Sequence, residues 1–521
     1  MKKLGLICGA AMLMGLTACG DPPEADYLIS GGIVHVGDMS DGFTGHVALK
    51  GGQIVYVGQK RPKLQAKQVI DASGLIVSPG FIDPHTHSQE DLLSDDIARR
   101  KNDNYRFQGV TTVFNGNDGF GSPDVARVSS DLNAKGFGTH TALFVGHGGT
   151  RKAVMGNANR EPTPEELSEM EALVAGGMEA GALGLSTGLF YAPGSFSKTD
   201  EVIALSKIAG QYGGIYDSHI RDEATYNIGL EAAIEEVLEI GRDADIPVHI
   251  AHIKALGVDV WGKSIPIIET INAARASGQR VTADQYPWPA SGTRISNALL
   301  PRWVKSGTNE EYMARLEDVS LRAKILAETR ENLRRRGGPE AVLITQDKKD
   351  WQGQTLGKIA LANDLPPAQM AIEIAKQGDA RIASFNMNAE DIANFMVQDW
   401  VMTSSDGSNG HPRKYASFPR KYETYVKAQG LMDIPSFIYR SSGLTAETFG
   451  LCRRGFLHEN YKADVVIFDP DSFSQVADFH KPKELSKGVM HMFIGGIPVI
   501  SNGVSLPAMP GQVLKRCKTE T

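Results

Sequence analysis

The sequence predicts an α/β fold in which a barrel of eight strand–helix units with an insertion is joined to a small β domain built from both chain ends. Two observations support this prediction. Between about residues 80 and 455, short β-rich apolar runs alternate with helical stretches, which is typical of a parallel sheet covered by helices. At both ends, glycine pairs separate short apolar runs, which is typical of hairpins. A chain of 521 residues has room for both units, because α/β barrels often exceed about 250 residues.

The first segment, residues 1–18, predicts a lipoprotein signal peptide. Two lysines precede an apolar run at 4–16, which is too short to span a membrane stably. The run leads into Leu-Thr-Ala-Cys, which resembles the bacterial lipobox, and we expect lipidation of Cys19. The alternative is an ordinary secretory signal that is cut nearby. Residues 19–26 then form a polar tether, and the mature protein is expected in the bacterial cell envelope, held to a membrane by the acyl chains on Cys19.

The β domain is expected from two distant stretches of similar pattern. Residues 27–78 contain YLISGGIVHVG and VALKGGQIVYVG, and residues 456–510 contain ADVVIFDP and HMFIGGIPVISNG. Because both stretches have the same short strands and glycine pairs, we expect the two ends to pair with each other. A tail at 511–521 closes the chain.

Residues 79–455 are expected to form the barrel. Its predicted strands include VTTVFNG, THTALFVG, ALGLSTG and IPVHIAHI, and its clearest helix covers 162–181. A segment near 300–345 is rich in Glu, Arg and Lys, which predicts a solvated helical insertion. We interpret the three arginines at 334–336 as a charged helix face and not as a nucleic-acid site.

The composition excludes several classes of protein. The chain has 54 basic and 61 acidic residues, a balance of −7, so nothing indicates a partner such as nucleic acid. With 41% hydrophobic and 22% charged residues, it is not a disordered chain. Four cysteines are too few for a disulfide scaffold or a Cys-rich zinc module. Any metal must therefore be bound by histidines and carboxylates.

Three predicted strands end in histidines, at the positions where barrel active sites are built. His85 and His87 follow the strand in SPGFIDPHTHS, whose two-residue period places both imidazoles on one side. Alone this pair is a weak signal, and two surface histidines are the alternative. His219 ends the strand in GGIYDSHIRDE. In VHIAHIK, His249 and His252 differ by three positions and face opposite sides, so we expect His252 at the site and His249 against the outer helices.

Asp406 directly follows a fourth predicted strand, in VMTSSDG. An aspartate near imidazoles and a metal can shuttle protons, although Ser-Asp-Gly is also ordinary turn sequence. Lys254 lies on the same strand face as His252. Four such positions in one α/β chain together predict a metal site.

These motifs resemble those of the metal-dependent amidohydrolases, and within them the N-acyl-D-amino-acid deacylases, or D-aminoacylases. The resemblance runs from about 27 to 505 and rests on PGFIDPHTH, GHGGTRKAVMG, GALGLSTGLFYAPG, YDSHIRDE, the His252-Ile253-Lys254 turn, and SSDG with HPR. It implies a (β/α)8 TIM barrel with a small β-sandwich from both chain ends, and one or two zinc ions or another divalent metal. It places His85 and His87 on one metal position, His219 and His252 on the other, and makes Asp406 a ligand and the catalytic acid/base.

The chain departs from the resemblance at GVTTVFNGNDG, where family members carry a metal-bridging cysteine and Asp118 stands here. A carboxylate is a harder ligand than a thiolate and binds zinc at about 2.0–2.2 Å. Asp118 either bridges two metals, binds one, or only makes a turn, because Asn-Asp-Gly is a good turn sequence. The strand ALGLSTG contains no lysine, so the carbamylated-lysine bridge of hydantoinase-like relatives is not expected.

The resemblance implies hydrolysis of the amide bond of N-acyl-D-amino acids, a small-molecule substrate. Zinc then supplies an activated water and polarises the carbonyl, and Asp406 moves the proton to the leaving nitrogen. Lys254, Tyr286 and Arg413 are implied to bind the substrate carboxylate, with Tyr191 near the acyl group. The alternatives are that Lys254 pairs with a neighbouring acid and that Tyr286 lies in the core.

Three other functions are alternatives to hydrolysis of N-acyl-D-amino acids. Ser186 in GLSTG fits the GxSxG pattern of a metal-independent serine hydrolase, but Pro193 and Gly194 leave no long helix directly after it. A non-catalytic binding lipoprotein could retain the scaffold without activity. Within the same superfamily, a dipeptide with a D-residue or a cyclic amide is the alternative substrate.

Overall fold

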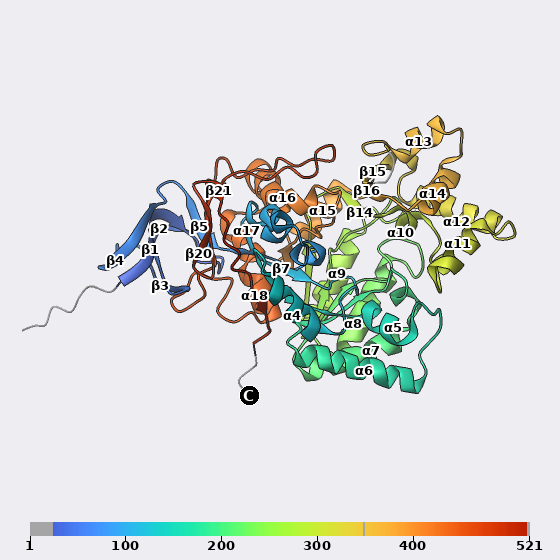
Figure 1. Ribbon diagram of the computed structural model, residues 1–521, viewed down its shortest axis with the longest axis horizontal. Helices are drawn as coiled ribbons and strands as arrows, with labels where there is room; N and C mark the ends of the chain where they lie inside the picture. The colour runs from blue at the N-terminus through green and yellow to red at the C-terminus, as the bar shows by residue number, and fades with distance from the viewer. Residues whose placement is uncertain (1–23, 347–349, 518–521) are drawn as a thin grey trace, which may run out of the picture.

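The computed structural model describes residues 24–346 and 350–517, with a β domain at one end of a barrel and an insertion at the other (Figure 1). The expected signal peptide and Cys19 lie outside the described residues. Within the described ranges, no helix combines the length and apolar character that a membrane crossing needs.

The barrel is formed by parallel strands in chain order. They are β6 (Phe81–Asp83), β7 (Val110–Asn115), β8 (His140–Leu143) continued by β9 (Val145–Gly146), β10 (Gly184–Gly188), β11 (Ile215–His219), β12 (Val248–Ile250), β13 (Val281–Gln285) and β17 (Val401–Thr403). Each strand pairs with the next, and a parallel bridge between Thr86 and Gly407 brings the first and last strands together. The strands are almost wholly buried, as expected for a parallel sheet with both faces covered.

Helices cover the outside of the barrel. The main ones are α4 (Val125–Lys135), α5 (His147–Met155), α6 (Pro164–Glu179), α7 (Thr199–Gln211), α8 (Leu230–Asp243), α9 (Ser264–Ala276), α15 (Ala389–Met396) and α17 (Ile434–Ser441). Shorter segments are α1 (Gln89–Leu92), α2 (Ile97–Lys101), α3 (Asp103–Arg106), η1 (Gly194–Phe196), α16 (Arg413–Arg420), η4 (Lys421–Ala428) and α18 (Gly443–Phe449). Helix α6 begins where its sequence dictates, because Thr163 and Glu166 form a capping box and Pro164 occupies the first turn.

The β domain is one nine-stranded sheet to which both chain ends contribute. Its strands are β1 (Glu24–Val34), β2 (Phe43–Lys50), β3 (Gln53–Gly58), β4 (Gln65–Asp71), β5 (Ile76–Pro79), β18 (Val465–Phe468), β19 (Val489–Ile494), β20 (Ile497–Ser501) and β21 (Val504–Ser505). The order is β21-β20-β19-β18-β5-β1-β2-β3, with β4 paired to β1. The antiparallel β5–β18 pair joins the two ends. The predicted barrel with a β domain from both ends is thus confirmed.

The insertion is larger than the helical segment expected near 300–345. It runs from β14 (Ala290–Arg294) to β16 (Arg381–Phe385) and includes β15 (Val342–Gln346). It also contains α10 (Ile295–Leu299), η2 (Arg302–Lys305), α11 (Asn309–Glu317), α12 (Arg322–Arg335), η3 (Pro339–Ala341), α13 (Leu356–Ala362) and α14 (Pro367–Lys376). Its three strands form an antiparallel sheet, and its apolar side chains form a separate core. The buried run in β16 has the pattern of a barrel strand, which is why the sequence did not mark it as part of the insertion.

The segment after residue 510 was expected to be a tail, and the structure corrects this. Strand β22 (Val513–Leu514) pairs in parallel with β8 of the barrel. Cys517 forms a disulfide with Cys452, with their Cα atoms 5.5 Å apart. The C-terminal segment therefore packs on the barrel through strand pairing and a covalent bond.

Candidate metal centre and active-site pocket

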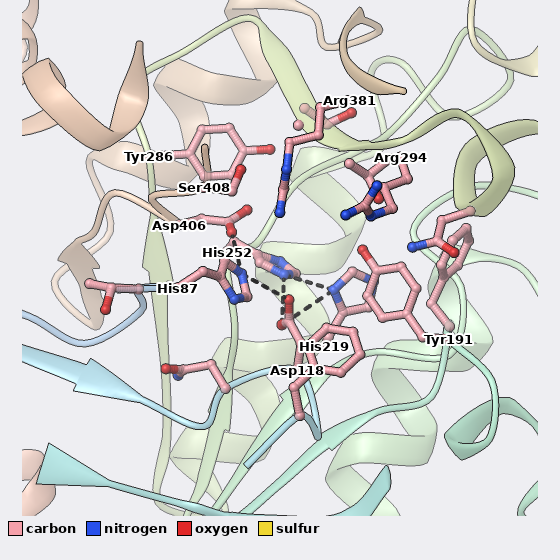
Figure 2. Close-up of a pocket in the computed structure, with 18 of the residues that line it drawn as sticks. His87, Asp118, Tyr191, His219, His252, Tyr286, Arg294, Arg381, Asp406 and Ser408 are labelled. Carbon is pink, nitrogen blue, oxygen red and sulfur yellow. Dashed lines mark hydrogen bonds and ion pairs between the residues drawn. The ribbon is translucent and has the colours of Figure 1, made fainter. Parts of the chain in front are cut away.

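The predicted ligands lie together at the carboxyl ends of the barrel strands (Figure 2). They follow or end five different strands, which bring residues distant in sequence to one mouth of the barrel. The residues are His85 and His87 after β6, Asp118 after β7, His219 at the end of β11, His252 after β12 and Asp406 after β17.

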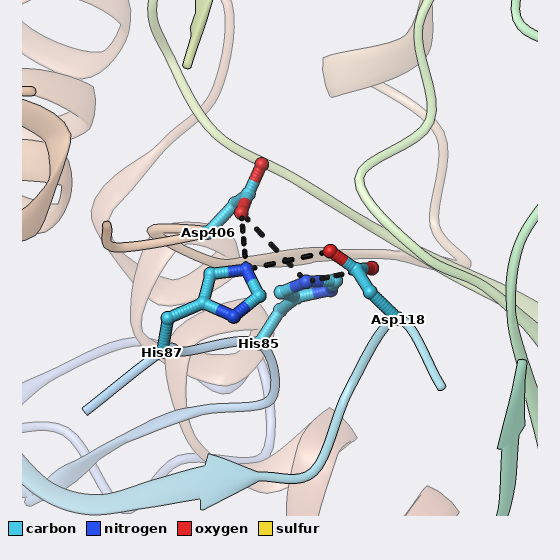
Figure 3. A group of neighbouring side chains, drawn as sticks. All are labelled: His85, His87, Asp118 and Asp406. Carbon is cyan, nitrogen blue, oxygen red and sulfur yellow. Dashed lines mark hydrogen bonds and ion pairs between the residues drawn. The ribbon is translucent and has the colours of Figure 1, made fainter. Parts of the chain in front are cut away.

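One group of side chains consists of two histidines and two aspartates (Figure 3). His87 Nε2 lies 3.1 Å from Asp406 Oδ1 and 3.4 Å from Asp118 Oδ2. His85 Nε2 lies 3.3 Å from Asp118 Oδ1 and 3.8 Å from Asp406 Oδ1. All four can offer a ligand atom to one ion, because these atoms lie within 4.8 Å of one another.

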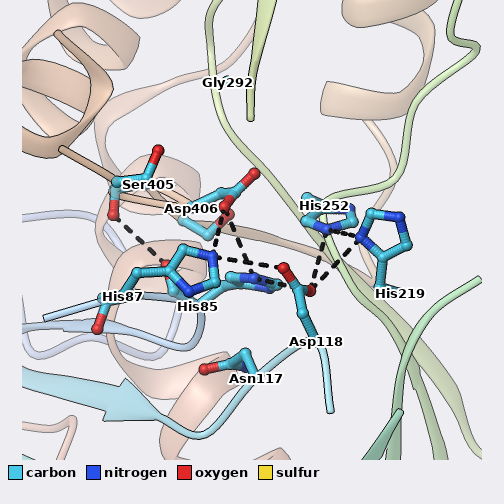
Figure 4. A network of polar contacts seen from close by, with 12 residues as sticks. His85, His87, Asn117, Asp118, His219, His252, Gly292, Ser405 and Asp406 are labelled. Atoms are coloured by element: carbon cyan, nitrogen blue, oxygen red, sulfur yellow. Dashed lines mark hydrogen bonds and ion pairs between the residues drawn. The ribbon is translucent and has the colours of Figure 1, made fainter. Parts of the chain in front are cut away.

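A second group shares Asp118 with the first (Figure 4). Asp118 Oδ1 lies 3.3 Å from His252 Nε2 and 3.5 Å from His219 Nδ1, and these two nitrogens are 2.8 Å apart. Asp118 therefore lies between two pairs of histidines, with its Oδ2 towards His87 alone. Of the three roles that the sequence left open for Asp118, this position favours the bridging one.

The donor set fits a divalent metal ion. His85 Nε2 and Asp118 Oδ1 are buried and make no hydrogen bond. Burial would raise the pKa of Asp118, but His85, His219 and His252 outweigh it and hold that pKa well below its usual range. Imidazole nitrogens around an ionised carboxylate match the ligands that zinc accepts.

Three residues of the centre adopt left-handed backbone conformations. The φ angles are +57° for Asp118, +37° for His252 and +45° for Asp406. Such angles are uncommon for residues other than glycine and cluster at functional sites, where the surrounding structure holds them. Each of the three thus turns its side chain into the barrel mouth directly after a strand.

A polar network beneath the centre includes Asp284 and His249, which were not predicted as site residues. Asp284 on β13 lies 2.9 Å from His249 Nε2 and 3.7 Å from His85 Nδ1, and it accepts a hydrogen bond from Ser404. His249 contacts Phe449 of helix α18, in agreement with its expected place against the helices, and it also supports Asp284 under the metal ligands. Asp284 was not predicted, because none of the strands identified in the sequence covers residues 281–285.

A model described as the amidohydrolase family matches residues 68–500. The chain belongs to the amidohydrolase family. It is 30% identical to a D-aminoacylase of Alcaligenes xylosoxydans xylosoxydans, over 95% of this chain and 99% of that one. It is 31% identical to an N-acyl-D-aspartate deacylase of the same organism, over 95% of both chains. The crystal structure of N-acyl-D-glutamate deacylase from Bordetella bronchiseptica, with zinc and a phosphonate inhibitor, is 28% identical. That structure matches with a TM-score of 0.81 over 94% of this chain and 100% of that one.

In the amidohydrolase, Lys254 pairs with an acid and also borders the pocket. Its Nζ contacts Glu223 Oε1 and lies 2.8 Å from His252 Nδ1. Glu223 Oε1 in turn lies 3.2 Å from His252 Nδ1. Glu223 was not predicted as a site residue, although it is the last residue of the motif YDSHIRDE. This carboxylate orients His252 from behind, as acids commonly do for metal-binding imidazoles.

Arg413 is held within the protein next to the proposed acid/base. Its Nη1 lies 2.8 Å from Asp406 Oδ2, and its guanidinium lies over the ring of Tyr286, with Cζ 4.7 Å from the ring centroid. Its Nη2 donates to the carbonyl oxygen of Gly292. Arg413 is not among the residues that line the cavity. The structure therefore places it as a support for Asp406 and Tyr286.

The cavity above the centre of the amidohydrolase has a volume of about 380 Å³. Tyr191, Lys254, Tyr286 and Ser291 line it, as do three arginines of the insertion: Arg294, Arg336 and Arg381. Arg336 belongs to the run at 334–336 that was expected to form a charged helix face, but it is buried and lines the cavity. Arg294 and Arg381 were not predicted as site residues, because only the packing of the insertion brings them over the barrel mouth.

Ser186 does not occupy a nucleophile position in this amidohydrolase. It lies inside strand β10, fully buried, and its Oγ donates to Asp217 Oδ2 at 2.6 Å. A nucleophile elbow needs a sharp turn from strand to helix with an exposed serine. The geometry therefore gives no support to a serine hydrolase.

Proposed function

We propose that this amidohydrolase hydrolyses the amide bond of N-acyl-D-amino acids and releases a carboxylic acid and a D-amino acid. The observation that carries the proposal is the cluster of four histidines and two aspartates beneath a cavity of small-molecule size. Relatives named D-aminoacylase and N-acyl-D-aspartate deacylase match nearly the whole chain and support the choice of substrate.

The proposed cofactor is Zn²⁺, as one or two ions, the metal found in the N-acyl-D-glutamate deacylase structure. His85, His87 and Asp406 would hold one ion, and His219 and His252 the other, with Asp118 between them. Bound zinc polarises a carbonyl and lowers the pKa of water towards about 7.

Asp406 is the residue proposed to move the proton. Burial would raise the pKa of Asp406, but Arg413 and the neighbouring histidines outweigh it and hold that pKa well below its usual range. The carboxylate is therefore ionised near neutral pH and can accept a proton from water. Arg413 fixes Oδ2, while Oδ1 faces His87. Asp406 then returns the proton to the leaving nitrogen, without which the amine is not expelled.

The two ends of the substrate have different surroundings. Lys254 and Tyr286 lie beside His252, with Lys254 Nζ 5.6 Å from the Tyr286 ring centroid, and are proposed to bind the α-carboxylate. Tyr191 lies beside His219, with ring centroids 4.7 Å apart, and is proposed to contact the acyl group.

A specific observation favours an acidic side chain on the D-amino acid. Arg294 and Arg381 stand directly opposite each other on β14 and β16, and both guanidinium groups point into the cavity (Figure 2). Like charges in this arrangement repel. Within the described residues neither arginine forms an ion pair, and Glu90, which lines the same cavity, and Asp379 act on Arg381 only from a longer distance. A second carboxylate on the substrate would pair with them, as in N-acyl derivatives of D-aspartate or D-glutamate.

The test is amine release from N-acetyl-D- and N-acetyl-L-amino acids with acidic, neutral and basic side chains, before and after chelation. We expect turnover of the D series only, loss on chelation, and recovery with added Zn²⁺. Arg381→Met should reduce kcat/KM for acidic side chains alone, whereas Arg330→Met, an exposed arginine on α12, should leave it unchanged. Turnover that survives complete metal removal would contradict the proposal.

We also propose an exported lipoprotein located in the bacterial cell envelope and anchored through Cys19. The disulfide between Cys452 and Cys517 supports an oxidising compartment, because such bonds persist mainly outside the cytosol. Cys19→Ala should move the enzyme from the membrane to the soluble fraction of the source cells. If the variant stayed with the membranes, the anchor would have to be elsewhere.

A further inference from the structure

A second cavity of about 650 Å³ adjoins the active-site cavity. Phe190 and Asn297 line both cavities and therefore stand at the boundary between them. The second cavity lies between the barrel and the insertion, lined on one side by Ser195 and Tyr226 and on the other by residues of α10, η2 and α12. The function proposed above makes no use of it.

Arg302, the first residue of η2, is the distinctive group in this cavity. Its Cζ lies 3.9 Å from the centroid of the Phe190 ring and 5.5 Å from that of Tyr226. Its Nε and Nη2 atoms are buried and have no hydrogen-bond partner. Arg302 thus has aromatic neighbours but, within residues 24–346 and 350–517, no carboxylate within ion-pair distance.

The other charged residues of the cavity are already paired. Glu331 binds Arg334 and Arg335, and Glu328 accepts a hydrogen bond from Trp303 Nε1 at 3.0 Å. Arg302 is half-buried, and its guanidinium has no ion-pair partner among the described residues. Burial lowers its pKa to about 10, and the charge of Asp222 opposes that shift only in part. Such a charge is costly unless a partner arrives, and a carboxylate is the partner that a guanidinium binds best.

The position of Arg302 indicates which end of the substrate would contact its guanidinium. The Phe190 ring contacts both groups, with its centroid 3.9 Å from Arg302 Cζ and 5.6 Å from the centroid of the His219 imidazole. A single aromatic ring thus connects Arg302 to a metal ligand. Phe190 and Tyr191 flank His219 on the proposed acyl side, away from Lys254 and Tyr286.

We propose that the second cavity is an acyl-group subsite in which Arg302 binds a terminal carboxylate. The enzyme then prefers N-acyl-D-amino acids whose acyl chain is that of a dicarboxylic acid, long enough to pass Phe190. This inference rests on the function proposed above, because it assumes that the scissile amide lies at the metal centre. The aliphatic part of the chain would lie along Phe190 and Leu300 in the cavity.

The test compares kcat/KM for one D-amino acid carrying glutaryl, adipoyl or suberoyl groups with kcat/KM for the monomethyl esters of the same acyl groups. The esters match the length and remove the charge. At one of these lengths, we expect the free acid to be favoured about tenfold or more, the effect of a charge-assisted hydrogen bond. Arg302→Met should abolish this preference and leave N-acetyl turnover unchanged, and Arg302→Lys should retain part of it. Arg330→Met is the matched control for general loss of charge.

Equal rates for acids and esters at every length in the wild type would overturn the proposal, as would an undiminished preference in Arg302→Met. If Arg302→Met fails to fold, the wild-type series and Arg302→Lys decide. Failure of the proposed function has a different signature, because N-acetyl-D-amino acids would then not be hydrolysed by the zinc-loaded enzyme either.

Discussion

Asp118 connects the two halves of the metal centre through a single carboxylate. Its Oδ1 lies within 3.5 Å of three imidazole nitrogens, and its Oδ2 lies 3.4 Å from His87 Nε2. A carboxylate has two oxygens to distribute between two ions, whereas a thiolate has one sulfur to share. We therefore expect the centre to depend on this residue for holding metal.

We expect Asp118→Asn to lose most of the bound metal, because the amide keeps the shape but not the negative charge. Asp118→Cys should retain metal through a thiolate. The measurement is metal content per chain after dialysis, by elemental analysis, with exposed Asp124→Asn as the matched control. Unchanged metal content in Asp118→Asn would reduce Asp118 to a turn residue.

For Asp406→Asn, we expect the fold to be kept and turnover to fall by about 10²–10⁴, the usual contribution of a positioned proton carrier. The assay is kcat on the best N-acetyl-D-amino acid in excess Zn²⁺, so that weakened metal binding is not limiting. A rate near that of the wild type would exclude Asp406 from proton transfer.

At this scale the sequence located most of the metal-binding cluster, because each histidine or aspartate follows a local strand pattern. It did not show that His249 also joins the polar network under the site, because counting by twos assumes a continuous strand. Strand β12 ends at Ile250, and His252 has a left-handed φ of +37°, so His249 and His252 both contribute to one polar assembly. The prediction that His85 and His87 lie on one face was not affected, because no left-handed residue separates them.

At the scale of elements, one buried group ties the barrel to the β domain. Asp464 next to β18 binds Arg454, lies 3.2 Å from His140 Nε2 on β8, and accepts from the Gly495 amide at 2.7 Å. Burial would raise the pKa of Asp464, but Arg454 and His140 outweigh it and hold that pKa below its usual range. The stability that Asp464 contributes is therefore present above its unfolded pKa of 3.8 and is lost as pH falls through the folded value.

We expect Asp464→Asn to destabilise the protein by about 3–5 kcal/mol near neutral pH, because it leaves buried Arg454 without its partner. The difference in apparent Tm between wild type and variant should shrink as pH is lowered below about 4. Thermal unfolding from pH 3 to 8 measures both effects. A pH-independent difference would assign the loss to packing and not to charge.

The insertion was the element that local sequence patterns described least well. Its sheet pairs β14 with β16 across a segment that contains five helices, so neither strand reveals its partner locally. The facing positions of Arg294 and Arg381 follow from that pairing alone. The barrel strands were easier to predict, since each pairs with the next in the chain.

For the whole molecule, the Cys452–Cys517 disulfide closes a loop of 65 residues that contains the second part of the β domain. In the chain-entropy account, a bond across a loop of this length stabilises by about 4 kcal/mol. The double variant Cys452→Ala/Cys517→Ala should have a lower apparent Tm, and a reducing agent should lower that of the wild type only. Identical Tm values for wild type and variant without reductant would show that strand β22 alone secures this end.

The insertion has a core of its own, and the five arginines that line the two cavities, Arg294, Arg302, Arg335, Arg336 and Arg381, all belong to it. The barrel supplies the ligands of the metal centre, and the insertion supplies the unpaired positive charge that faces the substrate. In the proposed function, the barrel thus carries the reaction chemistry and the contacts to the scissile amide's neighbours, and the insertion adds the charges that distinguish one substrate from another. Grafting an insertion from another family member, cut at residues 290 and 385, is a direct route to altered substrate range with the hydrolytic centre untouched.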